Sequence, residues 1–254
     1  MTGLDPAQSL GATLDRLSGV TLWQPNTGHR TTIDTLLLAR FAARGRHPRS
    51  VLDLGCGAGA AALVLQHSGV GEDFVLWDND EAACALARLN AERSGLAAEI
   101  VQRDVASGIG DEFAGRFDLV VMNPPYFEPG SARPPRQAPG AAIGALAPFL
   151  TLARDALARR GRVCVCYPAR SLPELLSHAA RVGLLAKRLR LVHAYADRDA
   201  RLALTEFKPG RPGGLCVEPP LVEWRSAGVP SAELAELSAP RAVDRAESPP
   251  PPAR

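Results

Sequence analysis

Short apolar runs alternate along the chain with longer stretches in which apolar residues recur at helical spacing. The apolar runs cover residues 50–55, 74–78, 98–104, 117–123 and 161–168. Two of the intervening stretches, residues 60–69 and 81–95, end at glycine, which commonly stops a helix. Alternating strands and helices indicate right-handed crossovers and a mostly parallel sheet that is covered on both faces. The pattern therefore predicts a doubly wound α/β domain.

The pattern changes after the helix predicted for residues 171–184. Two β-like runs, residues 185–194 and 201–210, are joined by the short polar segment "YADRDA". Because this link is too short to hold a crossover helix, the two runs are expected to pair antiparallel at the end of the sheet.

The two ends of the chain differ from this central pattern. Residues 1–48 are expected to form an N-terminal extension with a helix over Leu36 to Ala42, capped by Thr32 or Asp34. Residues 49–224 form the predicted domain. Residues 225–254 hold few large apolar side chains among Ala, Pro, Ser and charged residues, so they are interpreted as a disordered, non-catalytic tail.

Composition narrows the class of protein. The 254 residues are 46% hydrophobic and carry 29 basic against 27 acidic residues, so no overall field of one sign points to nucleic acid or membrane. Five cysteines without paired spacing are expected to be reduced core residues, and no metal is expected. No apolar stretch is long enough for a membrane helix, and a cytoplasmic protein is predicted.

A glycine-rich turn gives the first candidate site. In "VLDLGCGAG", residues 51–59, Asp53 ends a predicted strand and Gly55, Gly57 and Gly59 follow before a helix. Glycines let the backbone turn sharply and approach a ligand, while the helix presents unpaired N–H groups. The GxGxG spacing differs from the GxGxxG typical of nicotinamide folds. A tight turn without a ligand is the alternative.

Acidic residues end the next two predicted strands. In a doubly wound sheet the ligand lies over the carboxyl ends of the strands, where Asp78 can accept hydrogen bonds from both hydroxyls of a ribose. Asp104 is placed to meet the amino group of an adenine ring, and a solvated strand end is the alternative. Asp80 and Glu81 are expected to cap the following helix.

The strand at residues 117–123 runs into Asn123-Pro124-Pro125-Tyr126. With the D-x-G-x-G-x-G turn and "DNDEAACALARLN" (residues 78–90), this tetrapeptide resembles the class I S-adenosylmethionine-dependent methyltransferases. The resemblance implies a Rossmann-like methyltransferase fold with a seven-stranded, mostly parallel sheet. It also implies a bound S-adenosylmethionine whose methionine end lies near Asp53 and the glycines and whose ribose meets Asp78.

The same resemblance assigns catalysis to the tetrapeptide. It is similar to sites that hold a planar nitrogen nucleophile in line with the sulfonium methyl group. The Asn123 side-chain oxygen and the Pro124 carbonyl would accept hydrogen bonds from an NH₂ group, while Pro125 stiffens the backbone. Tyr126, or alternatively Phe127, would stack on a base.

Residues 28–42 and 183–224 resemble the bacterial tRNA(Val) adenine-N6 methyltransferases. This resemblance implies transfer of a methyl group to the N6 amine of an adenine in tRNA, with RNA as the partner. Where that family commonly has an arginine this chain has Pro139, and Arg133 and Arg136 are expected to compensate. N5-methylation of a protein glutamine is one alternative, and a non-catalytic S-adenosylmethionine-binding protein is another.

A basic region near the C-terminal strand pair gives separate support for RNA. Residues 154–211 contain 13 basic and 5 acidic residues. Lys187 and Arg188, with Arg190, Arg198 and Arg201, are expected to contact phosphates in a salt-sensitive manner. A solvated, solubilising face is the alternative. The sequence sets no oligomeric state.

Overall fold

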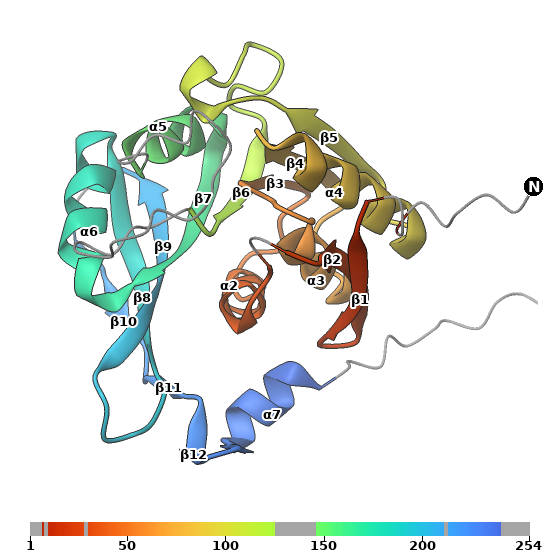
Figure 1. The fold of residues 1–254 in the computed structure, drawn as a ribbon. Coiled ribbons are helices and arrows are strands. Elements are labelled where there is room, and N and C mark those ends of the chain that lie inside the picture. Colours follow the sequence, from red (N-terminus) through yellow and green to blue (C-terminus); the bar gives the residue numbers. More distant parts are fainter. Residues whose placement is uncertain (1–6, 8–9, 28–29, 125–145, 211–212, 240–254) are drawn as a thin grey trace, which may run out of the picture.

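The computed structural model describes residues 7, 10–27, 30–124, 146–210 and 213–239. Within these residues, nine strands form one central sheet (Figure 1). The strands are β3 Ser50–Leu54, β4 Asp73–Asp78, β5 Ala98–Gln102, β6 Phe117–Met122, β7 Leu157–Pro168, β8 Leu184–His193, β9 Ala200–Pro209, β10 Cys216–Val217 and β11 Leu221–Val222.

The sheet has the order β10-β8-β9-β7-β6-β3-β4-β5, and β11 pairs with the far end of β8. Strands β3 to β7 are parallel, whereas β9 runs antiparallel between β7 and β8. The predicted mostly parallel α/β fold with an antiparallel C-terminal pair is therefore confirmed. The seven predicted strands are joined by β10 and β11, each of two residues and too short to give a pattern in the sequence.

Helices cover both faces of the sheet. One face carries α2 Ile33–Ala42, α3 Ala60–His67 and α4 Glu81–Ser94, and the other carries α5 Leu146–Ala156 and α6 Leu172–Arg181. The short 3-10 turns are η1 Val105–Ser107 and η2 Ala169–Ser171. Alternate strand residues point to opposite faces, so Val51 joins the first core cluster and Leu52 the second. Both clusters are apolar, as expected for a parallel sheet buried on two sides.

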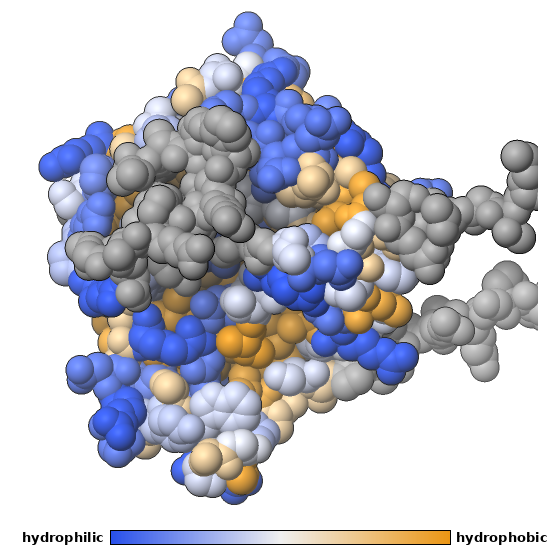
Figure 2. Space-filling model, in the orientation of Figure 1, coloured by the Kyte–Doolittle hydropathy of each residue, from blue (hydrophilic) through white to orange (hydrophobic). Residues whose placement is uncertain are grey.

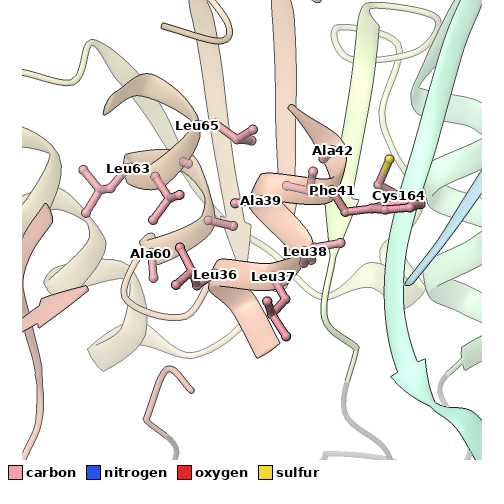
Figure 3. Close-up of a cluster of buried hydrophobic side chains, with 14 of the residues drawn as sticks. Leu36, Leu37, Leu38, Ala39, Phe41, Ala42, Ala60, Leu63, Leu65 and Cys164 are labelled. Atoms are coloured by element: carbon pink, nitrogen blue, oxygen red, sulfur yellow. The ribbon is translucent and has the colours of Figure 1, made fainter. Parts of the chain in front are cut away.

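Helix α2 lies against the sheet and beside α3, and nearly all of its surface is buried. Figure 3 shows Leu36 directed toward Ala60 of α3 and Phe41 toward Cys164 of β7. The Thr32 side chain caps this helix and accepts a 3.3 Å hydrogen bond from the Asp34 backbone N–H. The predicted helix in the N-terminal extension is thus present, with Thr32 as its cap.

The N-terminal extension also contains a β-hairpin that the apolar pattern did not predict. Strand β1 Ala12–Leu17 pairs antiparallel with β2 Val20–Pro25, and the turn uses Ser18 and Gly19 at φ of 51° and 84°. Such a turn with two left-handed residues matches the twist of a hairpin. Leu22 packs into the same core cluster as α2 and α3, so the hairpin is part of the folded unit.

The prediction of a disordered tail from residue 225 is wrong for residues 225–239. Strand β12 Trp224–Ser226 pairs with β13 Val229–Pro230, and α7 Ala232–Ser238 follows. Leu234 is 4% exposed and lies in the core, while Glu233 forms a 2.7 Å ion pair with Arg190. These contacts are made with distant parts of the chain, which local composition does not report. Residues 240–254 lie outside the described residues.

The cysteines follow the prediction with one exception. Cys56, Cys84, Cys164 and Cys166 are buried and free, but Cys216 is exposed on the edge strand β10. An edge strand of two residues has no covering element on its outer side, which explains the exposure. Among the described residues, no helix combines the length and the apolar character needed to cross a membrane.

Candidate functional site

The carboxyl ends of the parallel strands β3, β4 and β6 meet at one edge of the sheet. The register sets Leu54 of β3 level with Trp77 of β4 and Met122 of β6. The residues that follow these three, including Asp78 and Asn123, therefore lie at the same edge, beside the start of the glycine loop. The structure thus brings together segments that are separated by about 70 residues in the chain, in the crevice where doubly wound folds bind ligands.

Glycine is required in this loop for two different reasons. A Cβ atom on Gly59 would lie 2.9 Å from Cδ2 of Leu76, so the loop packs too closely on β4 for a side chain. Gly57 has a positive φ of 54°, yet no described atom lies within 4 Å of its Cβ position. The backbone at Gly57 therefore has an open side that a ligand can approach.

Asp78 fastens the loop to the end of β4. Its Oδ2 accepts a 2.8 Å hydrogen bond from the Gly57 N–H, and its Oδ1 accepts a 3.0 Å bond from the Asp80 N–H. Burial raises the pKa of the Asp78 carboxyl, although both amide bonds act in the opposite direction. A carboxylate offers about four acceptor positions. This partly buried carboxylate can therefore accept further hydrogen bonds.

Asp53 lies under the same loop and is 4% exposed. Its Oδ2 accepts a 3.1 Å hydrogen bond from the Ala62 N–H in the first turn of α3. Burial raises the pKa of the Asp53 carboxyl to about 7, with a further contribution from the negative charge of Asp78. A cationic group bound nearby would favour the ionised form of Asp53.

Asp104 is exposed beyond the end of β5, where its Oδ1 accepts a 2.8 Å hydrogen bond from the Ala106 N–H and caps η1. Trp77 is fully buried, and its indole N–H donates a 2.7 Å bond to the Arg103 carbonyl. Trp77 is therefore a packing residue of the second core cluster. Asp80 caps α4 as predicted, through bonds from the Ala82 and Ala83 amides.

Asn123 and Pro124 follow β6 directly; Asn123 is partly exposed and Pro124 is buried. The structure therefore places the amide side chain of the tetrapeptide at the edge that carries the glycine loop. The remaining predicted site residues in this region, Pro125, Tyr126, Phe127, Arg133 and Arg136, lie outside the described residues.

The basic residues of β8 have partners within the protein. Arg188 donates a 2.7 Å hydrogen bond to the Phe41 carbonyl at the end of α2 and pairs with Glu206 and Glu218 at 3.3 Å each. Its guanidinium group also lies 3.9 Å from the centre of the Phe41 ring. Lys187 donates a 2.6 Å bond to the Gly213 carbonyl. The structure thus gives Arg188 a role in the fold in place of the expected phosphate contact.

Arg190 and Arg201 are likewise engaged in ion pairs. Arg201 pairs with Asp34 at 2.7 Å and with both carboxylate oxygens of Glu223, and these contacts raise its pKa. The ion pairs of Arg201 with Asp34 and Glu223 border a mainly apolar cleft of about 800 Å³ between α2 and α7. Figure 2 shows apolar surface exposed around the position that these two helices occupy in Figure 1. Arg190 and Arg201, which contribute to the basic character of this region in the sequence, are therefore paired with carboxylates of the protein itself.

Two residues near the loop were missed by the sequence reasoning. Phe149 of α5 is buried close to the loop, because a Cβ atom on Gly55 would lie 3.1 Å from its ring. Asn90 of α4 is 1% exposed and bonds to the Ala58 carbonyl at 2.9 Å. A polar residue at a buried position of an otherwise apolar helix face was the available signal for Asn90.

A glycine loop between acidic strand ends, on a sheet of this order, is the arrangement of an S-adenosylmethionine-dependent methyltransferase, and the chain is an enzyme of this class. It belongs to the methyltransferase small domain family, whose model matches residues 30–171. The open side of Gly57 and the acceptors of Asp78 and Asp53 fit S-adenosylmethionine as the cofactor. Among the described residues, no group of three or more His, Cys, Asp or Glu side chains could hold a metal ion.

Curated relatives include enzymes with different substrates. A tRNA1(Val) (adenine(37)-N6)-methyltransferase of Porphyromonas gingivalis is 31% identical over 202 residues, which cover 73% of this chain and 77% of the relative. A release factor glutamine methyltransferase of Geobacter sulfurreducens is 37% identical over 94 residues, which cover 37% of this chain and 32% of the relative.

Solved structures share the fold at lower identity. A predicted O-methyltransferase from Agrobacterium tumefaciens matches 83% of this chain and 99% of its own with a TM-score of 0.64 and 21% identity. A T. thermophilus 16S rRNA methyltransferase in complex with AdoMet and guanosine matches 78% of this chain and 50% of its own, with a TM-score of 0.54 and 22% identity.

Proposed function

We propose that the enzyme transfers the methyl group of S-adenosylmethionine to the N6 amine of an adenine in tRNA. The observation that carries the proposal is the position of Asn123, which follows β6 at the strand edge beside the glycine loop. The similarity to a tRNA adenine-N6 methyltransferase over about three quarters of both chains supports the substrate.

Asn123 and Pro124 supply what an adenine amine needs to react. The lone pair of this amine is delocalised into the ring, so the amine is a weak nucleophile. The Asn123 side-chain oxygen and the Pro124 carbonyl would accept its two N–H bonds and favour the pyramidal geometry that directs the lone pair outward. Holding the amine in line is itself a large contribution to rate. The amine nitrogen would form a bond to the transferred methyl carbon while the bond from that carbon to the sulfonium sulfur breaks. The neutral thioether would leave, and the nitrogen would release one proton to solvent.

The acidic strand ends would hold the cofactor, which supplies an electrophilic methyl group on a sulfonium. Asp78 would accept hydrogen bonds from the ribose hydroxyls, with its position fixed by the Gly57 and Asp80 amides. Asp53 would offset the positive charge at the methionine end, and Asp104 would meet the adenine amino group of the cofactor.

Contacts to RNA are proposed for residues around the site. Tyr126 or Phe127 would stack on the target base. Arg133 and Arg136 would pair with phosphates, and Lys187 would add a salt-sensitive contact. Arg188 is not part of this set, because its guanidinium group holds the end of α2.

N5-methylation of a protein glutamine is the second candidate. A side-chain amide is also a planar, weakly nucleophilic nitrogen, so the same pair of acceptors could serve it. The matched release factor glutamine methyltransferases, however, cover only 37% and 44% of this chain.

The two candidates can be separated with the purified enzyme and S-adenosylmethionine labelled in its methyl group. One reaction receives tRNA from a strain that lacks the gene, and a parallel reaction receives a purified release factor. The proposal expects label in tRNA, recovered as N6-methyladenosine after digestion and mass spectrometry. Label in glutamine of the protein, or in another nucleoside, would replace the proposed substrate.

A further inference from the structure

Asn90, in the third turn of α4, makes three hydrogen bonds with its buried side chain. Its Oδ1 accepts a 2.6 Å bond from the Trp23 backbone N–H, and its Nδ2 donates a 2.8 Å bond to the Trp23 carbonyl. The same Nδ2 donates a 2.9 Å bond to the Ala58 carbonyl. One amide group therefore joins strand β2, helix α4 and the glycine loop.

The bonds to Trp23 copy the pairing between neighbouring strands. A side-chain amide has the same donor and acceptor as a peptide group, so Asn90 satisfies both polar groups of a β2 residue at once. This pairing fixes the position of Asn90 relative to the N-terminal hairpin. The second N–H is thereby directed at Ala58, which lies between Gly57 and Gly59.

The loop needs such a fixed partner because its backbone is intrinsically permissive. Gly57 and Gly59 both have positive φ, and glycine populates many other conformations at little cost. On one side the Asp78 carboxylate accepts the Gly57 N–H. On the other side Asn90 donates to the carbonyl of the very next residue. The peptide groups flanking the open side of the loop are therefore held from two directions.

We infer that Asn90 is a positioning residue for the cofactor loop, and that through it the N-terminal hairpin holds the loop in the conformation that binds S-adenosylmethionine. Asn90 acts through Ala58 and does not touch the reacting atoms. The inference concerns cofactor binding and is independent of the identity of the methyl acceptor.

A matched control is available in the same hairpin. Gln24 is 4% exposed, and its side chain bonds to Asp15 and to the Thr31 N–H, both at 2.6 Å. Within the described part of the chain, neither bond involves the glycine loop. Asn90→Ala and Gln24→Ala each remove a buried amide with hydrogen bonds to the N-terminal extension, but Gln24→Ala leaves the bonds from Asn90 to Trp23 and Ala58 in place. Only Asn90→Ala removes a bond to the loop.

The test measures the Kd for S-adenosylmethionine by isothermal titration calorimetry, together with kcat and KM, on full-length variants whose folding is checked by circular dichroism. Asn90→Ala is expected to raise the Kd and KM roughly tenfold or more, about the effect of one lost hydrogen bond, while kcat at saturating cofactor stays within about twofold. Gln24→Ala is expected to bind the cofactor like the parent. An unchanged Kd in Asn90→Ala, or an equal rise in Gln24→Ala, would overturn the inference.

Hydrogen exchange supplies a second readout if Asn90→Ala does not fold. Asn90→Asp keeps the acceptor for the Trp23 N–H and nearly the same volume but removes both donors. Backbone amides of residues 57–59 are expected to exchange faster in this variant at temperatures where the sheet amides remain protected. Unaltered protection of residues 57–59 would show that the loop holds its shape without Asn90 and would sink the inference.

Discussion

The Asp78 carboxylate accepts a 2.8 Å hydrogen bond from the backbone amide of Gly57. This bond joins the end of β4 to the glycine loop after β3, so one acidic side chain sets the distance between two segments of the cofactor site. The remaining acceptor capacity of the same carboxylate is proposed to bind the ribose hydroxyls. Its two tasks can be separated by substitution.

Asp78→Asn retains one oxygen that can accept the Gly57 N–H, but it replaces the oxygen that accepts the Asp80 N–H with an NH₂ group. It also lacks the charge that would strengthen bonds to ribose hydroxyls. Charge-assisted hydrogen bonds contribute roughly 1.5–3 kcal/mol, so the Kd for S-adenosylmethionine is expected to rise roughly tenfold to a hundredfold, as measured by titration calorimetry. Asp80→Asn is the control, because Asn caps a helix about as well as Asp. Equal affinity in both variants would remove Asp78 from the ribose site.

The raised pKa of the buried Asp53 carboxyl predicts that the stability of the protein depends on pH. The pKa of the Asp53 carboxyl is about 7 in the folded protein, whereas its ordinary value, expected in the unfolded chain, is 3.8. Between these values the folded state binds more protons, so the free energy of unfolding falls as pH rises from about 4 to about 7. The full effect of such a shift is roughly 4 kcal/mol.

Asp53→Asn removes this titration and can still accept the Ala62 N–H. The variant is therefore expected to be more stable than the parent at pH 8, with a difference that shrinks toward pH 4. Urea unfolding at several pH values measures it. A difference that does not vary with pH would show that Asp53 titrates normally. The same variant should bind S-adenosylmethionine more weakly, because a buried negative charge near a cationic ligand is lost.

Asn123→Ala tests the methyl-transfer step. Loss of the side-chain acceptor is expected to lower kcat by roughly a hundredfold or more, while the Kd for S-adenosylmethionine changes less than about threefold. Single-turnover assays with tRNA and calorimetry measure the two quantities. Asn123→Asp keeps an acceptor oxygen at the same position and should retain more activity than Asn123→Ala. Parallel loss of affinity and turnover in Asn123→Ala would mean that Asn123 serves the cofactor instead.

Arg188→Ala separates a fold role from an RNA role. The substitution takes one partner from Glu206 and from Glu218, and it leaves the Phe41 carbonyl with the longer 3.3 Å bond from the Arg44 N–H. A loss of roughly 2–4 kcal/mol in unfolding free energy is expected, with the KM for tRNA unchanged at temperatures where the variant is folded. Lys187→Ala should show the reverse, a weaker and less salt-dependent interaction with tRNA at nearly parental stability.

Leu234→Ala tests the packing of α7. Deletion of a buried leucine side chain is expected to cost roughly 2–4 kcal/mol of unfolding free energy. Glu236→Ala, on the exposed side of the same helix, should change it by less than about 0.5 kcal/mol. Chemical unfolding measures both. Equal stability of the two variants would mean that α7 does not contribute to the core.

The features that could be predicted from the sequence are those that depend on local pattern. Strands β3, β4 and β6 are buried on both faces and appear in the sequence as continuous apolar runs. The repeated glycines of residues 55–59 predict a turn after β3. The start of β7 was predicted four residues late, at 161 instead of Leu157, because "LARR" gives no β pattern of its own.

The parts that could not be predicted depend on pairing between distant residues. The β1–β2 hairpin mixes exposed and buried positions, and it is recognisable mainly by what its inner face covers. The arginines of β8 suggested a nucleic-acid surface, yet their carboxylate partners are on β9, α7 and the segment after β10. Composition reports the charge but not the partner.

The buried guanidinium group of Arg40 joins the two ends of the described chain. It donates to the Ser18 hydroxyl at the tip of the hairpin at 2.5 Å, to the Ser68 hydroxyl after α3 at 2.7 Å and to the Leu237 carbonyl of α7 at 3.3 Å. Loosening the carboxyl-terminal helix would therefore release the hairpin as well. Asn90 bonds both to this hairpin and to Ala58 of the glycine loop. A substitution in α7, far from the loop, would therefore weaken the affinity for S-adenosylmethionine.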